Sequence, residues 1–446
     1  MAIDLDAEIG RVGLVDHHVH GALRERVGRR EFEEMITESD RPVPGWMTQM
    51  DSQIGFAIRR HCAPLLGLEA SASADDYWAA RAALEPGDLA RVFLRASGTD
   101  FWLVETGYKG ERILGMDGMA SAGGGEVREV VRLESLLEEV AAGGASASGL
   151  WDAFRAALQD RCALTPPRSV PVDTLATGQE DPVTAGRGDP LWAVQGDGLT
   201  SDGASLLTSG RGDDARSAQA YAARFGRAAR VVGLKSVVAY RHGFDFDPAP
   251  PSHAEVTNAA GNWLREIGHG AVPRVTDPVL LRMALWSGVE TGLPLQLHTG
   301  YGDPDLELHR CDPLLLTRWL KEVEHTGSSI LLLHCYPFQR NAGYLAQVFP
   351  HVFFDAGLAI NYTGARSDSV IAETLELAPF AKILYSSDAW GPPELHYLGA
   401  LLWRRGMTRA ASAWVEEGEW TAADAVRVAT MIGRSNAARV YGLDVP

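Results

Sequence analysis

The chain has 446 residues, 46% of them hydrophobic, and a formal net charge of −17 at pH 7. This acidic balance argues against nucleic acid and anionic membrane surfaces as partners. Four cysteines without paired spacing, an amino terminus without a signal-peptide core and the lack of a bilayer-spanning apolar run predict a cytoplasmic protein that does not associate with membranes.

The first predicted strand ends in a pair of histidines. Residues 15–20 read Val-Asp-His-His-Val-His. Side chains two apart in a strand point to the same side, so His18 and His20 should lie together and His17 should face away. Neutral imidazole is the commonest metal-binding side chain, so the pair indicates a metal site. Two solvated histidines before a turn would give the same pattern.

The next part of the chain alternates between helical and strand patterns and then changes character. The predicted elements are a broken helical segment at 30–66, strands at 101–106 and 129–133, and a helix at 151–162. Residues 166–214 are rich in Gly, Asp, Ser, Thr and Pro, with few large apolar residues. Such a composition buries too little surface to offset its ordering entropy. We therefore predict an inserted loop at 166–214, followed by an amphipathic helix at 215–230.

A single lysine lies within the strand predicted at 231–241. A buried lysine needs an ionic partner or a lowered pKa. Lys235 could therefore pair with a nearby carboxylate such as Asp388. Alternatively, its amine could have reacted with carbon dioxide to give a carbamate that bridges two metal ions. The sequence leaves both interpretations open.

Three further apolar runs end in a residue that can bind a metal. Residues 292–300 carry His298, residues 329–335 carry His334, and residues 381–388 end in Asp388. Each run is short and bounded by turn residues, which is typical of a strand buried on both faces in a parallel sheet.

The alternation of strands and helices is typical of a parallel α/β barrel, here interrupted by the loop at 166–214. The pattern is completed by a helix at 278–292, a strand at 351–360 and a helix from residue 421, with Thr421 as its cap. Functional groups of such a barrel gather at the carboxyl ends of its strands. We therefore expect the histidines, the lysine and the aspartate to meet there.

The order His-x-His, Lys, His, His, Asp on successive strands resembles the amidohydrolase superfamily of metal-dependent hydrolases. The resemblance implies the fold of that superfamily, one (β/α)8 TIM barrel over residues 1–446 with the inserted loop at 166–214. Three stretches of the chain closely resemble one branch of this superfamily. They are residues 233–241, residues 297–306, and His334-Cys335-Tyr336-Pro337 together with residues 355–360. That branch includes the amidohydrolase-like domain fused to glutamine synthetase in nodulin-type and fungal proteins. It also includes bacterial enzymes, some acting on γ-glutamyl amides. The superfamily often self-associates, so the resemblance is compatible with a homo-oligomer.

The resemblance implies that His18, His20, His298 and Asp388 hold a divalent metal, with zinc as the default and manganese or iron as alternatives. His334 would either bind a second metal together with Lys235 or stay unligated and polarise the substrate carbonyl. One or two ions are therefore expected. Asp388 is expected to take a proton from the activated water and pass it to the leaving amine.

The implied activity is hydrolysis of a C–N bond in a small molecule, such as a γ-glutamyl amide. A single-metal decarboxylase is the alternative enzyme. A non-catalytic binding module is the third interpretation, disfavoured because every ligand position is filled. For substrate contacts, we expect Arg241 to bind a carboxylate, unless it pairs with Asp245. We also expect Tyr336 to hydrogen-bond a carbonyl and Glu394 to recognise an amine.

Overall fold

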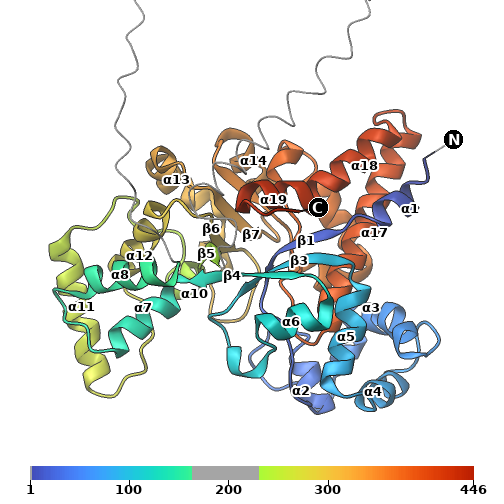
Figure 1. Cartoon of the computed structure of the whole chain (residues 1–446), viewed down its shortest axis with the longest axis horizontal. Coiled ribbons are helices and arrows are strands. Elements are labelled where there is room, and N and C mark those ends of the chain that lie inside the picture. Colours follow the sequence, from blue (N-terminus) through green and yellow to red (C-terminus); the bar gives the residue numbers. More distant parts are fainter. Residues whose placement is uncertain (1–2, 163–230, 446) are drawn as a thin grey trace, which may run out of the picture.

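A curled parallel sheet forms the centre of the computed structural model, which describes residues 3–162 and 231–445 (Figure 1). Its seven strands follow the chain in the order β1-β3-β4-β5-β6-β7-β8, and every neighbouring pair is parallel. The strands are β1 (Leu14–Val19), β3 (Thr99–Glu105), β4 (Glu126–Arg132), β5 (Val231–Ser236), β6 (Leu295–Thr299), β7 (Ile330–His334) and β8 (Val352–Phe354). A short parallel pair, β2 (Gly21–Ala22) and β9 (Trp390–Gly391), lies apart from this sheet.

Residues 383–388 close the sheet into a barrel, although they lack the geometry of a regular strand. On one side, the Leu384 amide donates to the Phe354 carbonyl of β8 at 3.0 Å. On the other side, the Asp388 amide donates to the His18 carbonyl of β1 at 3.1 Å. The predicted (β/α)8 barrel is therefore confirmed, with an irregular eighth segment.

The strands are buried on both faces, as their apolar sequences predict. One buried cluster takes a residue from nearly every strand, including Val15, Leu103 and Leu331, which places it inside the barrel. A larger cluster contains Leu297 and Leu332 together with the apolar faces of the helices. Adjacent strand residues therefore serve different cores because their side chains alternate between faces.

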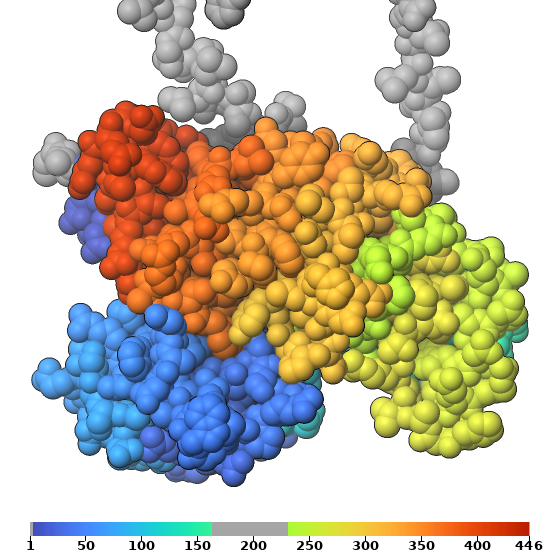
Figure 2. All heavy atoms as spheres, turned by 180° about the vertical axis from the view of Figure 1, so that it is seen from behind, coloured from blue at the N-terminus to red at the C-terminus, as the bar shows by residue number. Residues whose placement is uncertain are grey.

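Helices surround the barrel, and the amino-terminal ones gather beside the carboxyl-terminal helix α17 (Figure 1). From behind, the blue amino-terminal segment packs against the orange and red carboxyl-terminal half, and the yellow-green part forms a lobe at one end (Figure 2). The helices are α1 (Leu5–Gly10), α2 (Arg29–Glu34), α3 (Gln53–Ala57), α4 (Ala74–Ala82), α5 (Pro86–Ala96), α6 (Met116–Gly123), α7 (Leu133–Ala142), α8 (Leu150–Arg161), α10 (Val238–Arg241), α11 (His253–Gly268), α12 (Pro278–Glu290), α13 (Thr317–Val323), α14 (Gln339–Val348), α15 (Ala359–Thr363), α16 (Ser367–Thr374), α17 (Glu394–Glu416), α18 (Ala422–Thr430) and α19 (Asn436–Tyr441). The predicted cap is confirmed, because the Thr421 hydroxyl accepts from the Asp424 amide at 3.0 Å.

Three predicted elements were too long. The predicted strand 231–241 ends at Ser236, and its last four residues form α10. The predicted strand 351–360 ends at Phe354 and leads into α15, while the segment 30–66 is helical only in short pieces such as α2 and α3. The cause is the same in the first two cases, because at the carboxyl end of a barrel strand the chain must turn outward while its apolar residues stay buried.

The inserted loop predicted at 166–214 and the helix predicted at 215–230 lie outside the described residues. Across the residues that the structure describes, no helix is both long enough and apolar enough to cross a bilayer.

Candidate metal centre

Two histidines from β1 and one aspartate from the closing segment meet at the barrel mouth. Asp388 Oδ1 lies 3.1 Å from His18 Nε2 and 3.3 Å from His20 Nε2. One ligand atom from each of the three residues lies within 4.8 Å of the others. Asp388 has a φ of 52°, a left-handed conformation that is costly for a non-glycine residue and concentrates at functional sites.

The proton on His18 is fixed by Gln296, a buried residue of β6. The Gln296 amide nitrogen donates to the His17 carbonyl at 2.7 Å, so its Oε1 is the atom that faces His18 Nδ1 at 2.8 Å. An amide oxygen can only accept, so Nδ1 carries the proton. Burial lowers the pKa of His18 to about 3, so the ring is neutral. Its Nε2 therefore presents a bare lone pair to Asp388.

His20 is oriented in the same way by Glu105, at the end of β3. Its Nδ1 lies 3.2 Å from Glu105 Oε2, and Glu105 is itself held by Arg132. Burial lowers the pKa of His20, but Asp388 and Glu105 together raise it above its ordinary value. The two carboxylates thus favour a positive charge at this point, which a proton or a metal ion can supply.

These contacts fit a divalent cation. Burial by itself would raise the pKa of Asp388, but His334, His18 and His20 hold it well below its ordinary value, so the group is a carboxylate. A carboxylate oxygen 3.1 Å from a bare imidazole nitrogen is repulsive unless a cation lies between them. Two imidazoles and one carboxylate are a donor set that suits zinc, and also iron or manganese.

Lys235 lies beside this cluster, as the sequence predicted for its strand. The side chain is 1% exposed, and Nζ lies 3.5 Å from His18 Nε2. Burial lowers the pKa of Lys235 to about 8. The amine is therefore more available for reaction with carbon dioxide than a solvated lysine would be.

His334 and His298 lie near the cluster but outside the group of three. His334 Nε2 is 3.5 Å from Asp388 Oδ2, and burial lowers the pKa of its ring to about 4. His298 Nε2 is 3.0 Å from the Tyr301 carbonyl, so it donates its proton there and its Nδ1 is the free nitrogen.

Asp355 holds the end of β7 in place from behind the site. Its Oδ1 accepts from the His334 amide at 2.8 Å, and its Oδ2 lies 2.8 Å from His17 Nε2. This contact fixes the left-handed backbone of His334, which has a φ of 70°. His17 thus faces away from the metal cluster, as predicted from strand alternation.

A cavity of about 400 Å³ opens over the cluster. Its wall contains basic groups such as Arg132 and Arg241, acidic groups such as Glu38 and Asp303, and large rings. The charged and aromatic residues that line the cavity include His20, Glu38, Tyr108, Arg132, Lys235, Tyr240, Arg241, Arg274, His298, Asp303, Tyr362, Asp388 and Trp390. This mixture of polar and aromatic groups is typical of a small-molecule site.

The three predicted substrate contacts have different positions. Arg241 lines the cavity, and it pairs with Glu138 at 3.2 Å rather than with Asp245. Glu394 is fully buried and bonded to Arg81 at 2.6 Å, so its carboxylate is not part of the cavity wall. Tyr336 is also absent from the cavity wall, and its carbonyl accepts from the Tyr301 amide at 2.7 Å.

Four residues of the site were not singled out from the sequence. Glu105 ends an apolar strand, the same signal that identified Asp388, so it could have been found, whereas Arg132 ends a strand with several charged residues and gives a weaker signal. Gln296 is a polar residue inside an apolar run, which is a weaker signal. Glu38 follows α2 in a stretch where the sequence predicted only a broken helix.

The amino-acid sequence matches one family model and one fungal protein. A family model described as amidohydrolase matches residues 204–443. Protein fluG of Emericella nidulans is 33% identical over 227 residues, which are 48% of this chain. The match covers 26% of that protein, so the aligned part of this chain spans about a quarter of its relative's length.

Solved structures share the fold along almost the whole chain. A candidate metal-dependent hydrolase from Lactobacillus casei has a TM-score of 0.72 at 24% identity and covers 99% of this chain and 98% of its own. A uronate isomerase from Bacillus halodurans has a TM-score of 0.52 at 12% identity, covering 99% of this chain and 96% of its own. At these identities the two structures establish the fold alone.

Proposed function

The chain belongs to the amidohydrolase family, and we propose that it hydrolyses an amide C–N bond of a small molecule with the help of a divalent metal. The observation that carries the proposal is the meeting of His18 Nε2, His20 Nε2 and Asp388 Oδ1 at the barrel mouth. We assign these three residues as metal ligands. His298, whose Nδ1 is free beside them, would complete the set.

When bound, the metal lowers the pKa of a coordinated water to about 7 and polarises a substrate carbonyl. The protein residues then divide the remaining work. Asp388 can bind through Oδ1 and still offer Oδ2, which faces His334 Nε2 at 3.5 Å. Oδ2 is therefore placed to accept the proton of the attacking water and to return it to the leaving nitrogen.

His334 supports this step as a neutral group. Burial lowers its pKa to about 4, so the ring is uncharged near neutral pH. In a site with one metal, its buried ring would polarise the substrate carbonyl. In a site with two metals, it would bind the second ion together with a carbamylated Lys235.

The cavity wall favours a substrate that carries both an amine and a carboxylate. Arg241 Nη1 is buried and has no hydrogen-bond partner among residues 3–162 and 231–445, so it can hold a substrate carboxylate. Glu38 and Asp303 also face the cavity, and neither has an ion-paired cation among the described residues. A γ-glutamyl amide has both groups, so we place this substrate class first.

A decarboxylase is the second candidate, and a specific observation favours it. Both ring nitrogens of His334 lack a hydrogen-bond partner within the described part of the chain, and His334 lies outside the group of three ligands. A single metal with a free histidine is the arrangement that such a lyase would need.

The test is a panel of γ-glutamyl and other amides, together with unsaturated and aromatic acids, assayed on metal-loaded protein for released amine and released carbon dioxide. We expect amine release, and we expect Asp388→Asn to slow it by about 10²–10⁴-fold while most of the metal is retained. Carbon dioxide release without amine release would replace the hydrolase with the lyase. An Asp388→Asn variant with full turnover would remove Asp388 as the proton carrier.

A further inference from the structure

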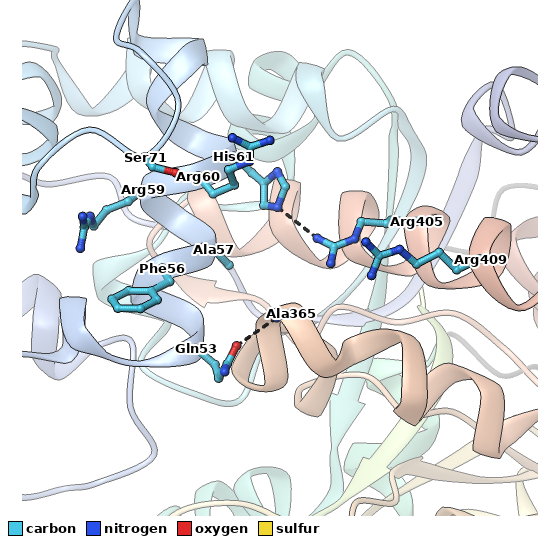
Figure 3. Close-up of a pocket in the computed structure, with 10 residues that line it drawn as sticks. All are labelled: Gln53, Phe56, Ala57, Arg59, Arg60, His61, Ser71, Ala365, Arg405 and Arg409. Atoms are coloured by element: carbon cyan, nitrogen blue, oxygen red, sulfur yellow. Dashed lines mark hydrogen bonds between the residues drawn. The ribbon is translucent and has the colours of Figure 1, made fainter.

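A second cavity, of about 720 Å³, lies between α3 and α17, away from the barrel mouth (Figure 3). It is separate from the cavity over the metal cluster, because no described residue lines both. Its polar and aromatic lining includes Gln53, Phe56, Arg60, His61, Arg405 and Arg409. The volume is within the range of small-molecule sites, roughly 300–1,000 Å³.

The charge of this cavity is opposite to that of the whole chain. Four arginines and a histidine line it, and no aspartate or glutamate does, although the chain has a net charge of −17. Most arginines of the described residues are paired with a carboxylate. Arg60 and Arg405 are not, while Arg409 pairs with Asp368 at 3.2 Å.

Two helices bring these cations together. A single π-helical turn after α3, η2 (Ile58–Cys62), carries Arg60 and His61, and such turns occur frequently at functional sites. Arg405 and Arg409 are one turn apart on α17, so they share a face. Figure 3 shows both side chains extending from α17 toward His61.

His61 orients one arginine without adding charge. Arg405 Nη1 lies 3.3 Å from His61 Nε2, and a guanidinium can only donate, so the imidazole nitrogen accepts. Burial, with Arg405 and Arg60 nearby, lowers the pKa of His61 to about 4. Burial and the neighbouring Arg409 lower the pKa of Arg405, and Asp368, which pairs with Arg409, is the one carboxylate among the described residues that opposes this effect on it. The guanidinium groups of this cavity therefore outnumber the carboxylates near them.

We propose that this cavity binds a phosphate monoester whose phosphate is held by Arg60, Arg405 and Arg409. Guanidinium groups match phosphate oxygens in a bidentate geometry, and a dianion would balance the unpaired cations. The cavity leaves room for an organic group as well. Phe56 is 56% exposed at its wall and offers an apolar ring to that group.

The experiment measures binding of phenyl phosphate to the metal-loaded protein by calorimetry, with phenol as the probe that lacks the phosphate. Wild-type protein should bind phenyl phosphate and not phenol. The double variant Arg60→Gln/Arg405→Gln should weaken binding by more than about tenfold, because two charge-assisted contacts are lost. The matched control is Arg318→Gln, an exposed arginine on α13, which should leave the affinity unchanged.

A second measurement on the wild type does not depend on the folding of a variant. Phenyl phosphate should protect Arg60 and Arg405 from modification by phenylglyoxal, as located by mass spectrometry, and should leave Arg318 reactive. Equal modification with and without the ligand would overturn the proposal. Binding that the double variant retains in full would also overturn it, because the ligand would then occupy another site such as the metal centre.

Discussion

At the scale of single residues, the proposed metal centre depends on side chains that would not touch the metal. Gln296 fixes the proton of His18 on Nδ1, and the Glu105 carboxylate lies 3.2 Å from Nδ1 of His20. Such outer contacts orient the ligands and tune their basicity. The ligands are therefore prepared before any metal arrives.

The first prediction concerns Gln296. Gln296→Met keeps the volume of the side chain but removes the acceptor for His18 Nδ1, so the ring can rotate or change its tautomer. We expect metal affinity to fall by about 10–100-fold, measured by competition with a chelator.

Gln339→Met is the matched control. Gln339 is also a buried glutamine, but it lies on α14 and contacts Glu373 instead of the metal cluster. Equal metal affinities for the two variants would show that Gln296 acts only through general packing.

Part of the site could be predicted at this scale, for a clear reason. His18, His20 and Asp388 each follow a short apolar run, so strand position alone indicated where they would meet. Glu394 was expected at the site because it follows Asp388 closely in the sequence, but its pairing with Arg81 of α4 is a long-range contact. No local pattern in the sequence reveals that contact.

At the scale of elements, α17 carries two arginines of the proposed phosphate site, Arg405 and Arg409, and also a buried histidine, His396. His396 is 1% exposed, and both of its ring nitrogens lack a hydrogen-bond partner among the described residues. Burial lowers the pKa of His396 from its ordinary value of 6.5 to about 3. The unfolded chain therefore binds a proton between these two pH values that the folded chain does not.

The second prediction follows from the lowered pKa of His396 in the folded state. The contribution of His396 to stability is complete above pH 6.5 and is lost as the pH falls toward 3. His396→Leu should therefore reduce the loss of unfolding free energy between pH 8 and pH 5 by about 2 kcal/mol. Denaturant unfolding at the two pH values measures it.

The control for this prediction is His309→Leu, because His309 is exposed. It should leave the difference between the two pH values unchanged. A wild-type-like difference in His396→Leu would mean that His396 does not titrate on unfolding as the structure implies.

The elements themselves were predicted well in kind and less well in length. Periodicity identified β5 and β8, but it could not show that Val238 and Ala359 leave the sheet, because apolar residues that cover a site look like strand residues. The bend after β8 also requires Leu358 at a φ of 29°. Nothing in the sequence around this leucine predicts a positive φ.

At the scale of the whole molecule, the proposed metal would link the first strand of the barrel to the last segment, which closes it. His18 and His20 come from β1, and Asp388 comes from the closing segment, where the sheet lacks a regular strand. A ligand that binds only the folded state stabilises it in proportion to the logarithm of its concentration over its dissociation constant. Bound metal should therefore raise the melting temperature of the protein by linking β1 to the closing segment.

The measurement that tests this account most directly is the metal content per chain by elemental analysis, on wild type and on His18→Ala/His20→Ala. We predict at least one equivalent of a divalent metal in the wild type, with two indicating a carbamylated Lys235. We predict loss of that metal in the double variant, with an unchanged circular dichroism spectrum. A wild type that stays metal-free after reconstitution, or a folded double variant that keeps stoichiometric metal, would contradict the account.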